Sequence, residues 1–281
     1  MQQNLKVFNA LITVLTAMLG ISEEECRKAL MTIAKENGYN PVQEMLDSIV
    51  WDGQDRITSL ISNIIGVKTE LEAVYIRRWL HQCLSMAFNS ETEPYGAEGL
   101  LVLIGKPASG KTLLFSKLAI NKELFLTGGH VDDKNSVLYW ITELNDFDKF
   151  DISKASKASN ESTIQEFIKA HEDTCYSPYE AKNIVKARRT SFCAGVNKTQ
   201  SLPEFPEFPE CFWVVDASNM DTNRIKALDE EWVKQLWRQV YEELYLPNPQ
   251  GFRARAAETA STVGKADTVE TVETVETATQ Q

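Results

Sequence analysis

The sequence predicts an α/β protein with a helical region before its core and a disordered tail after it. Three observations support this prediction. An apolar run at residues 99–104 leads through a glycine loop into an apolar helical face at residues 113–118, which gives the order strand, loop, helix. Helical periodicity covers much of residues 1–92, and residues 247–281 are polar and low in complexity. We therefore expect the α/β core to occupy residues 93–246, between these two parts.

The composition excludes several classes of protein. The 281 residues are 43% hydrophobic and 25% charged, which is typical of a soluble globular protein. The net charge of -11 argues against general coating of DNA, although it is compatible with a local basic strip. The five cysteines are dispersed and none has C-x-x-C spacing. This pattern predicts reduced thiols and a cytoplasmic location, without a disulfide framework or a zinc site.

The N-terminal region is expected to be mostly helical. Residues 7–20 are apolar but interrupted by polar side chains, and no small-residue cleavage site follows, so an amphipathic helix is favoured over a signal peptide. No apolar run is long enough to span a membrane. Ser22 and the three glutamates after it form a capping-box start for the next helix. Asn40 begins a short helix, and residues 57–65 and 71–89 also have helical periodicity.

The glycine loop reads GKPASGKT and fits the pattern G-x-x-x-x-G-K-[ST] at every fixed position. Gly105 and Gly110 allow backbone angles that a Cβ would forbid, so successive N–H groups can turn toward a phosphate, and we assign Ser109 to the same cradle. The following helix adds its positive N-terminal end. Lys111 would reach the β- and γ-phosphates of a nucleotide, and Thr112 would ligate Mg²⁺. The alternative is a chance match in an ordinary strand–turn–helix.

Two further strands are each followed by a polar residue with a candidate role. Residues 136–142 form an apolar run that ends at Glu143, about thirty residues beyond the loop. A carboxylate there can hold the Mg²⁺ shell or orient the attacking water, although many buried strands end in glutamate. Asp146 is a second candidate acid. Residues 190–195 predict a strand that leads to Asn197, whose amide would sense the γ-phosphate, and a turn asparagine is the alternative.

The remaining pattern predicts a hairpin, a strand and a long helix. Residues 175–188 suit a hairpin with a polar tip, on which Lys182 and Lys186 lie. Residues 211–216 form another apolar run, and residues 228–245 carry a strong apolar stripe at helical spacing. Taken singly, surface lysines such as these two more often belong to a solvated face than to a binding site.

An ordered set of short motifs resembles the virulence-associated protein E family over residues 38–245. The motifs lie before, within and after the glycine loop: Asn40-Pro41-Val42, Trp51-Asp52-Gly53, the loop itself, Trp140-Ile141-Thr142-Glu143, Pro178-Tyr179, Asn197 and Phe212-Trp213. The resemblance implies a superfamily 3 helicase-like protein with an AAA+-like P-loop ATPase core, which serves the replication of a phage or another mobile element. We expect no primase domain in this chain.

The resemblance also implies a role for each candidate residue. Lys111 and Thr112 become the Walker A pair, Glu143 the Walker B acid that also binds the metal, and Asn197 the γ-phosphate sensor. The implied ligands are ATP, Mg²⁺ and single-stranded or forked DNA, without a membrane, and a separate primase or replication initiator is a possible partner. The hairpin would point into the central pore of a homo-hexamer, where its DNA contacts would be Lys182, Lys186 and Arg188.

The sequence departs from the family in one four-residue stretch that bears on the rate of ATP hydrolysis. Where the family carries Gly-Asn-Arg-Arg before Phe-Trp, this chain has Phe208-Pro209-Glu210-Cys211, so both arginines are missing. An arginine supplied to the γ-phosphate is worth on the order of 10³–10⁵ in rate in related phosphoryl-transfer systems. Arg224 is the nearest downstream arginine that could replace them, and Arg188 and Arg189 are the upstream candidates. The alternative to an ATP-driven motor is therefore a nucleotide-binding regulatory or interaction protein with weak or no ATPase activity, and a small-molecule kinase is a third, less favoured class.

Overall fold

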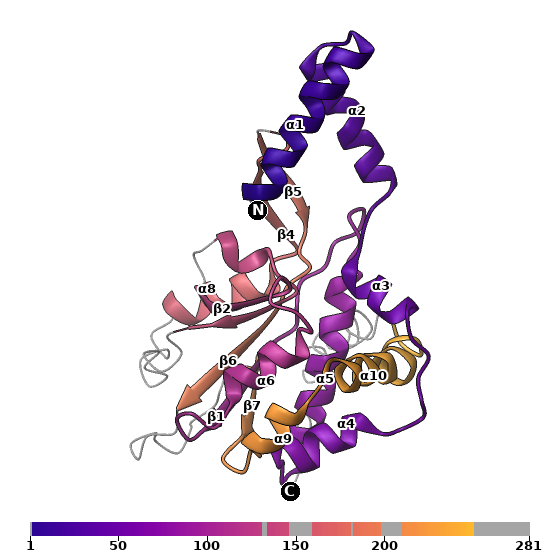
Figure 1. Ribbon diagram of the computed structural model, residues 1–281. Helices are drawn as coiled ribbons and strands as arrows, with labels where there is room; N and C mark the ends of the chain where they lie inside the picture. Colours follow the sequence, from indigo (N-terminus) through magenta and orange to yellow (C-terminus); the bar gives the residue numbers. More distant parts are fainter. Residues whose placement is uncertain (1, 131–133, 146–158, 181, 198–209, 250–281) are drawn as a thin grey trace, which may run out of the picture.

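Five parallel strands form the central sheet of the computed structural model, which describes residues 2–130, 134–145, 159–180, 182–197 and 210–249 (Figure 1). The strands lie in the order β2-β3-β6-β1-β7, and every neighbouring pair is parallel. Their carboxyl ends therefore meet at one edge, which is where ligands bind in open parallel sheets. The strands are β1 (Leu100–Gly105), β2 (Phe125–Gly129), β3 (Ile141–Leu144), β6 (Ser191–Asn197) and β7 (Phe212–Asp216).

Helices cover both faces of the sheet, because its strand β1 is apolar on both sides. Leu101 and Leu103 of β1 belong to one core cluster, whereas Leu100, Val102 and Ile104 belong to the other. The predicted mixed α/β class is confirmed by this arrangement. The first cluster includes α5 (Glu70–Ala87), α6 (Lys111–Leu118) and α10 (Glu230–Val240), and the second includes α8 (Ser159–Lys169).

The N-terminal helices divide between the core and the periphery. The capping box predicted at Ser22 is confirmed: its Oγ accepts the backbone N–H of Glu25, whose carboxylate accepts the N–H of Ser22 at 2.9 Å. Within the described residues no single helix is long and apolar enough to cross a membrane, and only the bent pair α1–α2 passes on length and composition. α1 (Gln2–Leu19) and α2 (Glu23–Glu36) extend away from the sheet (Figure 1), whereas α3 (Pro41–Asp47), α4 (Arg56–Thr58) and the π-helix η1 (Ser59–Ile65) join the first core cluster.

The predicted hairpin is confirmed as an antiparallel pair of strands, β4 (Glu172–Ser177) and β5 (Lys182–Ala187). Its turn contacts the two peripheral helices. Arg27 of α2 donates to the carbonyl oxygen of Tyr179 at 2.7 Å, and the Tyr179 ring meets Phe8 of α1 edge-on at 5.1 Å. The hairpin and the N-terminal helices therefore lie side by side on the same side of the molecule (Figure 1).

The structure corrects the limits of two predicted elements and adds two others. The strand predicted at 136–142 begins only at Ile141, because a 3₁₀ turn, η2 (Lys134–Val137), precedes it. The helix predicted at 228–245 begins at Glu230, and its last turn, η3 (Tyr241–Tyr245), is π-helical. The short elements β2 and α9 (Thr222–Ala227) are not predicted by apolar periodicity. Asp146, Phe208-Pro209 and residues 250–281 of the expected tail lie outside the described residues.

Candidate functional site

The glycine loop joins the carboxyl end of β1 to the first residue of α6. Gly110 precedes α6 with φ +95°, a conformation that strongly favours glycine, as predicted. Gly105 is required for a different reason from the one predicted, because its φ is not positive but a Cβ there would lie 2.9 Å from the carbonyl oxygen of Ala217. Ala108 adopts the second left-handed conformation of the loop, with φ 58°. The loop is thus tightly curved, with the N-terminal end of α6 behind it.

Lys111 is held inside this loop. Lys111 is only 6% exposed. Its Nζ donates to the carbonyl oxygen of Lys106 at 2.9 Å and to Oδ1 of Asn197 at 3.1 Å. Asn197 lies at the end of β6, directly beside Gly105 of β1 in the parallel register. The structure therefore brings together two predicted site residues that are far apart in the sequence.

Glu143 lies on β3 and accepts hydrogen bonds from two threonine hydroxyls. Oγ1 of Thr112 donates to its Oε1 at 2.8 Å, and Oγ1 of Thr127 donates to its Oε2 at 2.9 Å. Burial raises the pKa of Glu143 above its usual range, and the two hydroxyls and the charge of Lys111 oppose this shift. The sequence analysis did not identify Thr127, because it lies on the short strand β2 that apolar periodicity does not reveal.

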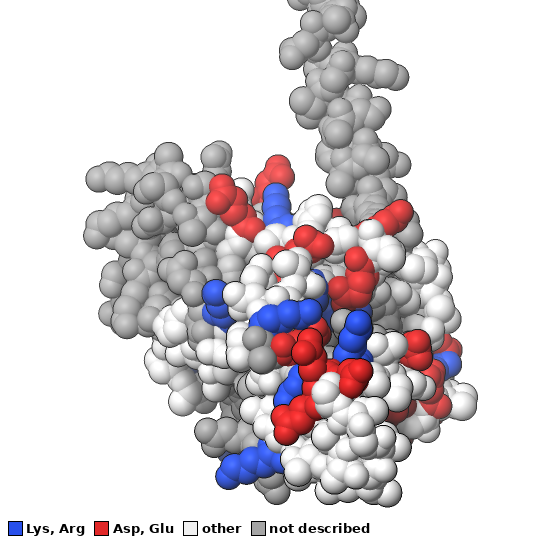
Figure 2. All heavy atoms as spheres, turned by 90° about the horizontal axis from the view of Figure 1, so that it is seen from above, with Lys and Arg blue, Asp and Glu red and all other residues white. Residues whose placement is uncertain are grey.

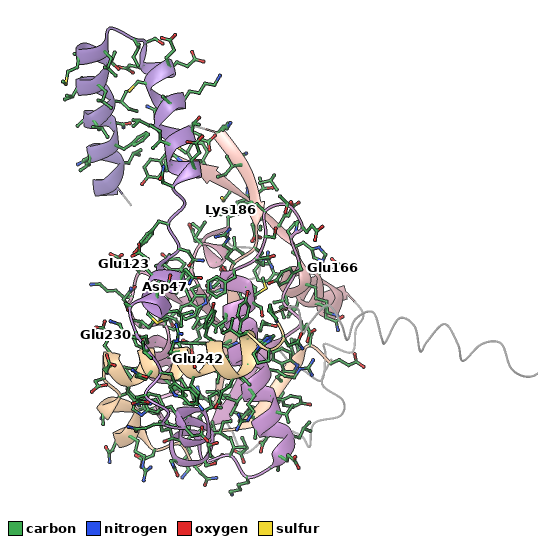
Figure 3. All side chains as sticks on the ribbon, turned by 90° about the vertical axis from the view of Figure 1, so that its right-hand side faces the viewer. Asp47, Glu123, Glu166, Lys186, Glu230 and Glu242 are labelled. Atoms are coloured by element: carbon green, nitrogen blue, oxygen red, sulfur yellow. The ribbon has the colours of Figure 1, made fainter. Side chains whose placement is uncertain are left out.

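Replacing Glu143 with glutamine should raise the stability of the folded protein, and the gain should grow with pH. The pKa of Glu143 is higher in the folded protein than its value of 4.5 in the unfolded chain. The stability that protonated Glu143 contributes is therefore fully present below the unfolded-state pKa and is lost as the pH rises through the folded-state pKa. Glutamine cannot ionise, so the variant does not lose this stability and its advantage grows with pH. Urea midpoints of both proteins from about pH 5 to about pH 8 measure the difference. The exposed Glu123 (labelled in Figure 3) is the control, and a gain from Glu143→Gln that does not change with pH would contradict the prediction.

A cavity of about 490 Å³ opens beside the loop, a size typical of small-ligand sites. Its lining comes from the loop, the first turn of α6, Gly195 and Asn197 at the end of β6, and two residues of α9, Thr222 and Lys226. Oγ1 of Thr222 donates to the carbonyl oxygen of Ser109 at 2.9 Å and so links α9 to the loop. The sequence analysis singled out Arg224 on this segment, but Arg224 is not among the cavity-lining residues. The only sequence feature that links Thr222 and Lys226 is their i, i+4 spacing, which would place both side chains on one face of a helix.

The two hairpin lysines lie away from this cavity. Lys182 is 62% exposed in its side chain and pairs with Glu180 across the turn at 2.9 Å. Lys186 is half-buried on the same strand, and Figure 3 shows it well separated from the acidic residues Glu230 and Glu242 of α10. On the face shown in Figure 2 acidic and basic side chains are interspersed, with no continuous basic surface among the described residues.

Arg188 requires a correction, because its position does not suit the DNA contact predicted for it. Its side chain is only 3% exposed and forms an ion pair with Asp173, which is itself 9% exposed. The guanidinium also donates to the carbonyl oxygen of Phe167 and lies over the rings of Phe167 and Phe192, at 4.8 and 5.5 Å from their centroids. Arg188 therefore anchors the base of the hairpin to α8 and β6, and its charge faces the interior.

Comparison with known proteins identifies the family of the chain. No curated protein matches the chain. Among solved structures, the apo structure of the NrS-1 C-terminal region (305–718) is similar, with 15% identity, a TM-score of 0.44 and coverage of 68% of this chain. This chain covers 45% of that structure, less than half of its length. A model of the virulence-associated protein E-like domain matches residues 46–270, and the chain belongs to that family.

Proposed function

We propose that this chain is an ATP-binding and ATP-hydrolysing DNA helicase-like replication protein of a phage or another mobile element. The observation that carries the proposal is the convergence of four predicted residues on one edge of the parallel sheet. These residues come from one helix and two strands: Lys111 and Thr112 from α6, Glu143 from β3 and Asn197 from β6. Lys111, Thr112 and Asn197 line a cavity large enough for a nucleotide, and Glu143 accepts a hydrogen bond from Thr112. Membership of the virulence-associated protein E-like family supports the replication context.

The geometry suggests how these residues would act on a nucleoside triphosphate. Lys111 would exchange its hydrogen bonds to Lys106 and Asn197 for the β- and γ-phosphates, and the freed Asn197 amide would face the γ-phosphate. The charge of a phosphate-bound Mg²⁺ would favour the ionised form of Glu143, which would then hold the metal shell or the attacking water. Among the described residues no three or more His, Cys, Asp or Glu side chains are placed to hold a metal ion together, so Mg²⁺ would take its other ligands from phosphate and water.

The strand order supports an AAA+-like arrangement for the proposed core. β6 lies between the loop strand β1 and the acid strand β3, so Asn197 at its end is placed between the loop and Glu143. The loop N–H groups and the N-terminal end of α6 would face the terminal phosphate, and the hydrogen bond from Thr112 links this end of α6 to Glu143.

The test of the proposal is the rate of phosphate release from ATP with and without single-stranded DNA. We expect hydrolysis that depends on Mg²⁺ and is stimulated by DNA. ATP binding without measurable hydrolysis under either condition would favour the alternative, a regulatory or interaction protein. That alternative is supported by the residues at the missing arginine pair, since Glu210 is exposed and acidic and Cys211 is buried at 2% exposure. A kinase would instead release ADP only when a small acceptor is added.

Removing both hairpin lysines should weaken binding of single-stranded DNA and flatten its salt dependence. Each phosphate contact contributes about 0.7 to the slope of log K against log salt for a single strand, so Lys182→Ala with Lys186→Ala should lower the slope by about 1.4. Fluorescence anisotropy of a labelled oligonucleotide across a salt series measures this slope. The matched control is Lys122→Ala with Lys234→Ala, which removes the same charge elsewhere. Equal slopes for the two double variants would return Lys182 and Lys186 to an ordinary solvated face.

A further inference from the structure

We propose that Lys226 of α9 binds the phosphate nearest the nucleoside, and that Thr222 and Lys226 form the nucleoside end of the cavity. The inference rests on the proposed nucleotide-binding function and goes beyond it, because it fixes which way the nucleotide lies and adds a cation from a segment outside the glycine loop. Three features of the structure support it: the order of the strands, the attachment of α9 to the loop, and the charge of Lys226.

The strand order sets the direction of the nucleotide. Glu143 lies on β3 and Asn197 on β6, both on one side of the loop strand β1. The strand on the other side of β1 is β7, and the chain continues from β7 into α9. The reacting γ-phosphate must lie near Glu143 and Asn197, because the groups that would assist its transfer are there. The opposite end of the nucleotide is then directed toward α9.

α9 is attached firmly to the loop. Besides the hydrogen bond from Thr222 to the carbonyl oxygen of Ser109, Ile225 is fully buried and approaches the loop so closely that a Cβ on Gly110 would lie 3.2 Å from its Cδ1. Asp221 precedes the helix and caps it with its side chain, and its backbone N–H donates to the carbonyl oxygen of Ile64 at 2.9 Å. Thr222 and Lys226, one helical turn apart, therefore face the cavity together.

Lys226 provides a cation that forms no ion pair with any residue the structure describes, and its side chain is exposed at the cavity. Lys111, the other lysine of the cavity lining, is already bound by Lys106 and Asn197 at the opposite end. Arg224 on the same helix is paired with Asp221 at 3.3 Å and does not line the cavity. An ammonium group here suits a phosphate oxygen, for which lysine acts as a point charge.

The test compares nucleotide affinities of Lys226→Ala with those of Arg224→Ala, a matched loss of one cation from the same helix. We expect Lys226→Ala to lose affinity for ATP and ADP to the same extent, by about tenfold, the effect of one charge-assisted hydrogen bond. Adenosine binding should not change. Arg224→Ala should stay within about twofold of wild type, and Lys226→Arg should recover most of the lost affinity. Titration calorimetry with ATP, ADP and adenosine provides the dissociation constants.

Each other outcome overturns the inference. A loss confined to ATP would place Lys226 at the γ-phosphate, and an equal loss for adenosine would place it at the nucleoside. Unchanged affinity for both ATP and ADP in Lys226→Ala would remove Lys226 from the site while leaving the proposed function intact. If the wild-type protein binds no nucleotide at all, the proposed function fails and this inference fails with it, so the two failures are distinguishable.

Discussion

Lys111→Ala should abolish binding of ATP·Mg²⁺ while the chain remains folded. The lysine is the buried cation of the loop, and its ammonium lies where the β- and γ-phosphates would replace Lys106 and Asn197 as hydrogen-bond acceptors. Hydrogen bonds to charged groups are worth about 1.5–3 kcal/mol each, so losing two of them should weaken ATP binding by more than about 100-fold. Calorimetric titration of ATP in the presence of Mg²⁺ measures the loss.

The fold should tolerate this change, because alanine is a good helix former at the first position of α6 and introduces no new buried polar group. Lys122→Ala serves as the control, since Lys122 is an exposed lysine a few residues beyond the same helix. A far-ultraviolet circular dichroism spectrum and a urea midpoint establish that the variant is folded. Wild-type ATP affinity in a folded Lys111→Ala protein would disprove the assignment of the glycine loop to phosphate binding.

Asp173→Ala should destabilise the protein by about 3–5 kcal/mol, the usual cost of leaving one partner of a buried ion pair uncompensated. Asp173 is the carboxylate that neutralises Arg188, and both side chains are almost completely buried. Without it the guanidinium would retain only the carbonyl oxygen of Phe167 and two aromatic rings. Equilibrium unfolding in urea measures the loss, which is large compared with the total stability of a typical domain.

Two further variants make this prediction specific. Glu230→Ala removes the partner of Lys234 in an exposed i, i+4 pair on α10 and should cost less than about 0.5 kcal/mol. Replacing Asp173 with leucine and Arg188 with methionine together should recover most of the stability lost in Asp173→Ala, because no charge is then left buried. A loss in Asp173→Ala as small as that in Glu230→Ala would show that Arg188 reaches solvent in solution, which would reopen its assignment as a DNA contact.

Part of the site was predictable because its residues are neighbours in the sequence. The order of an apolar strand, a glycine loop and a helix identifies the loop, and the φ of +95° at Gly110 agrees with the reason given for that glycine. The helix start at Ser22 and the hairpin at 172–187 were predictable for the same reason, since a cap or a tight turn depends on a few consecutive residues. The position of Asn197 beyond a strand made it a candidate, and the resemblance to a family favoured the sensor role over that of a turn asparagine.

Other features needed the tertiary structure. No local pattern shows that Arg188 is buried against Asp173. An arginine at the base of a hairpin has the same sequence context whether its side chain faces solvent or the interior. The hydroxyl of Thr127 reaches Glu143 only because β2 lies beside β3 in the sheet, and the burial that raises the pKa of Glu143 also depends on that packing. These properties depend on neighbours in space, which the order of residues along the chain does not specify.

The sequence by itself determined the α/β class, the glycine loop between strand and helix, and the helix caps, because each depends on the conformational preferences of adjacent residues. Only the tertiary structure decided which side chains surround the cavity. The hydrogen bond between Thr222 and Ser109 joins residues 113 positions apart. It holds α9 against the loop, so that Lys226 lines the cavity. The physical reason is that packing of α9 against α6 is set by the fully buried Ile225 and by the strand order, which are properties of the whole folded chain.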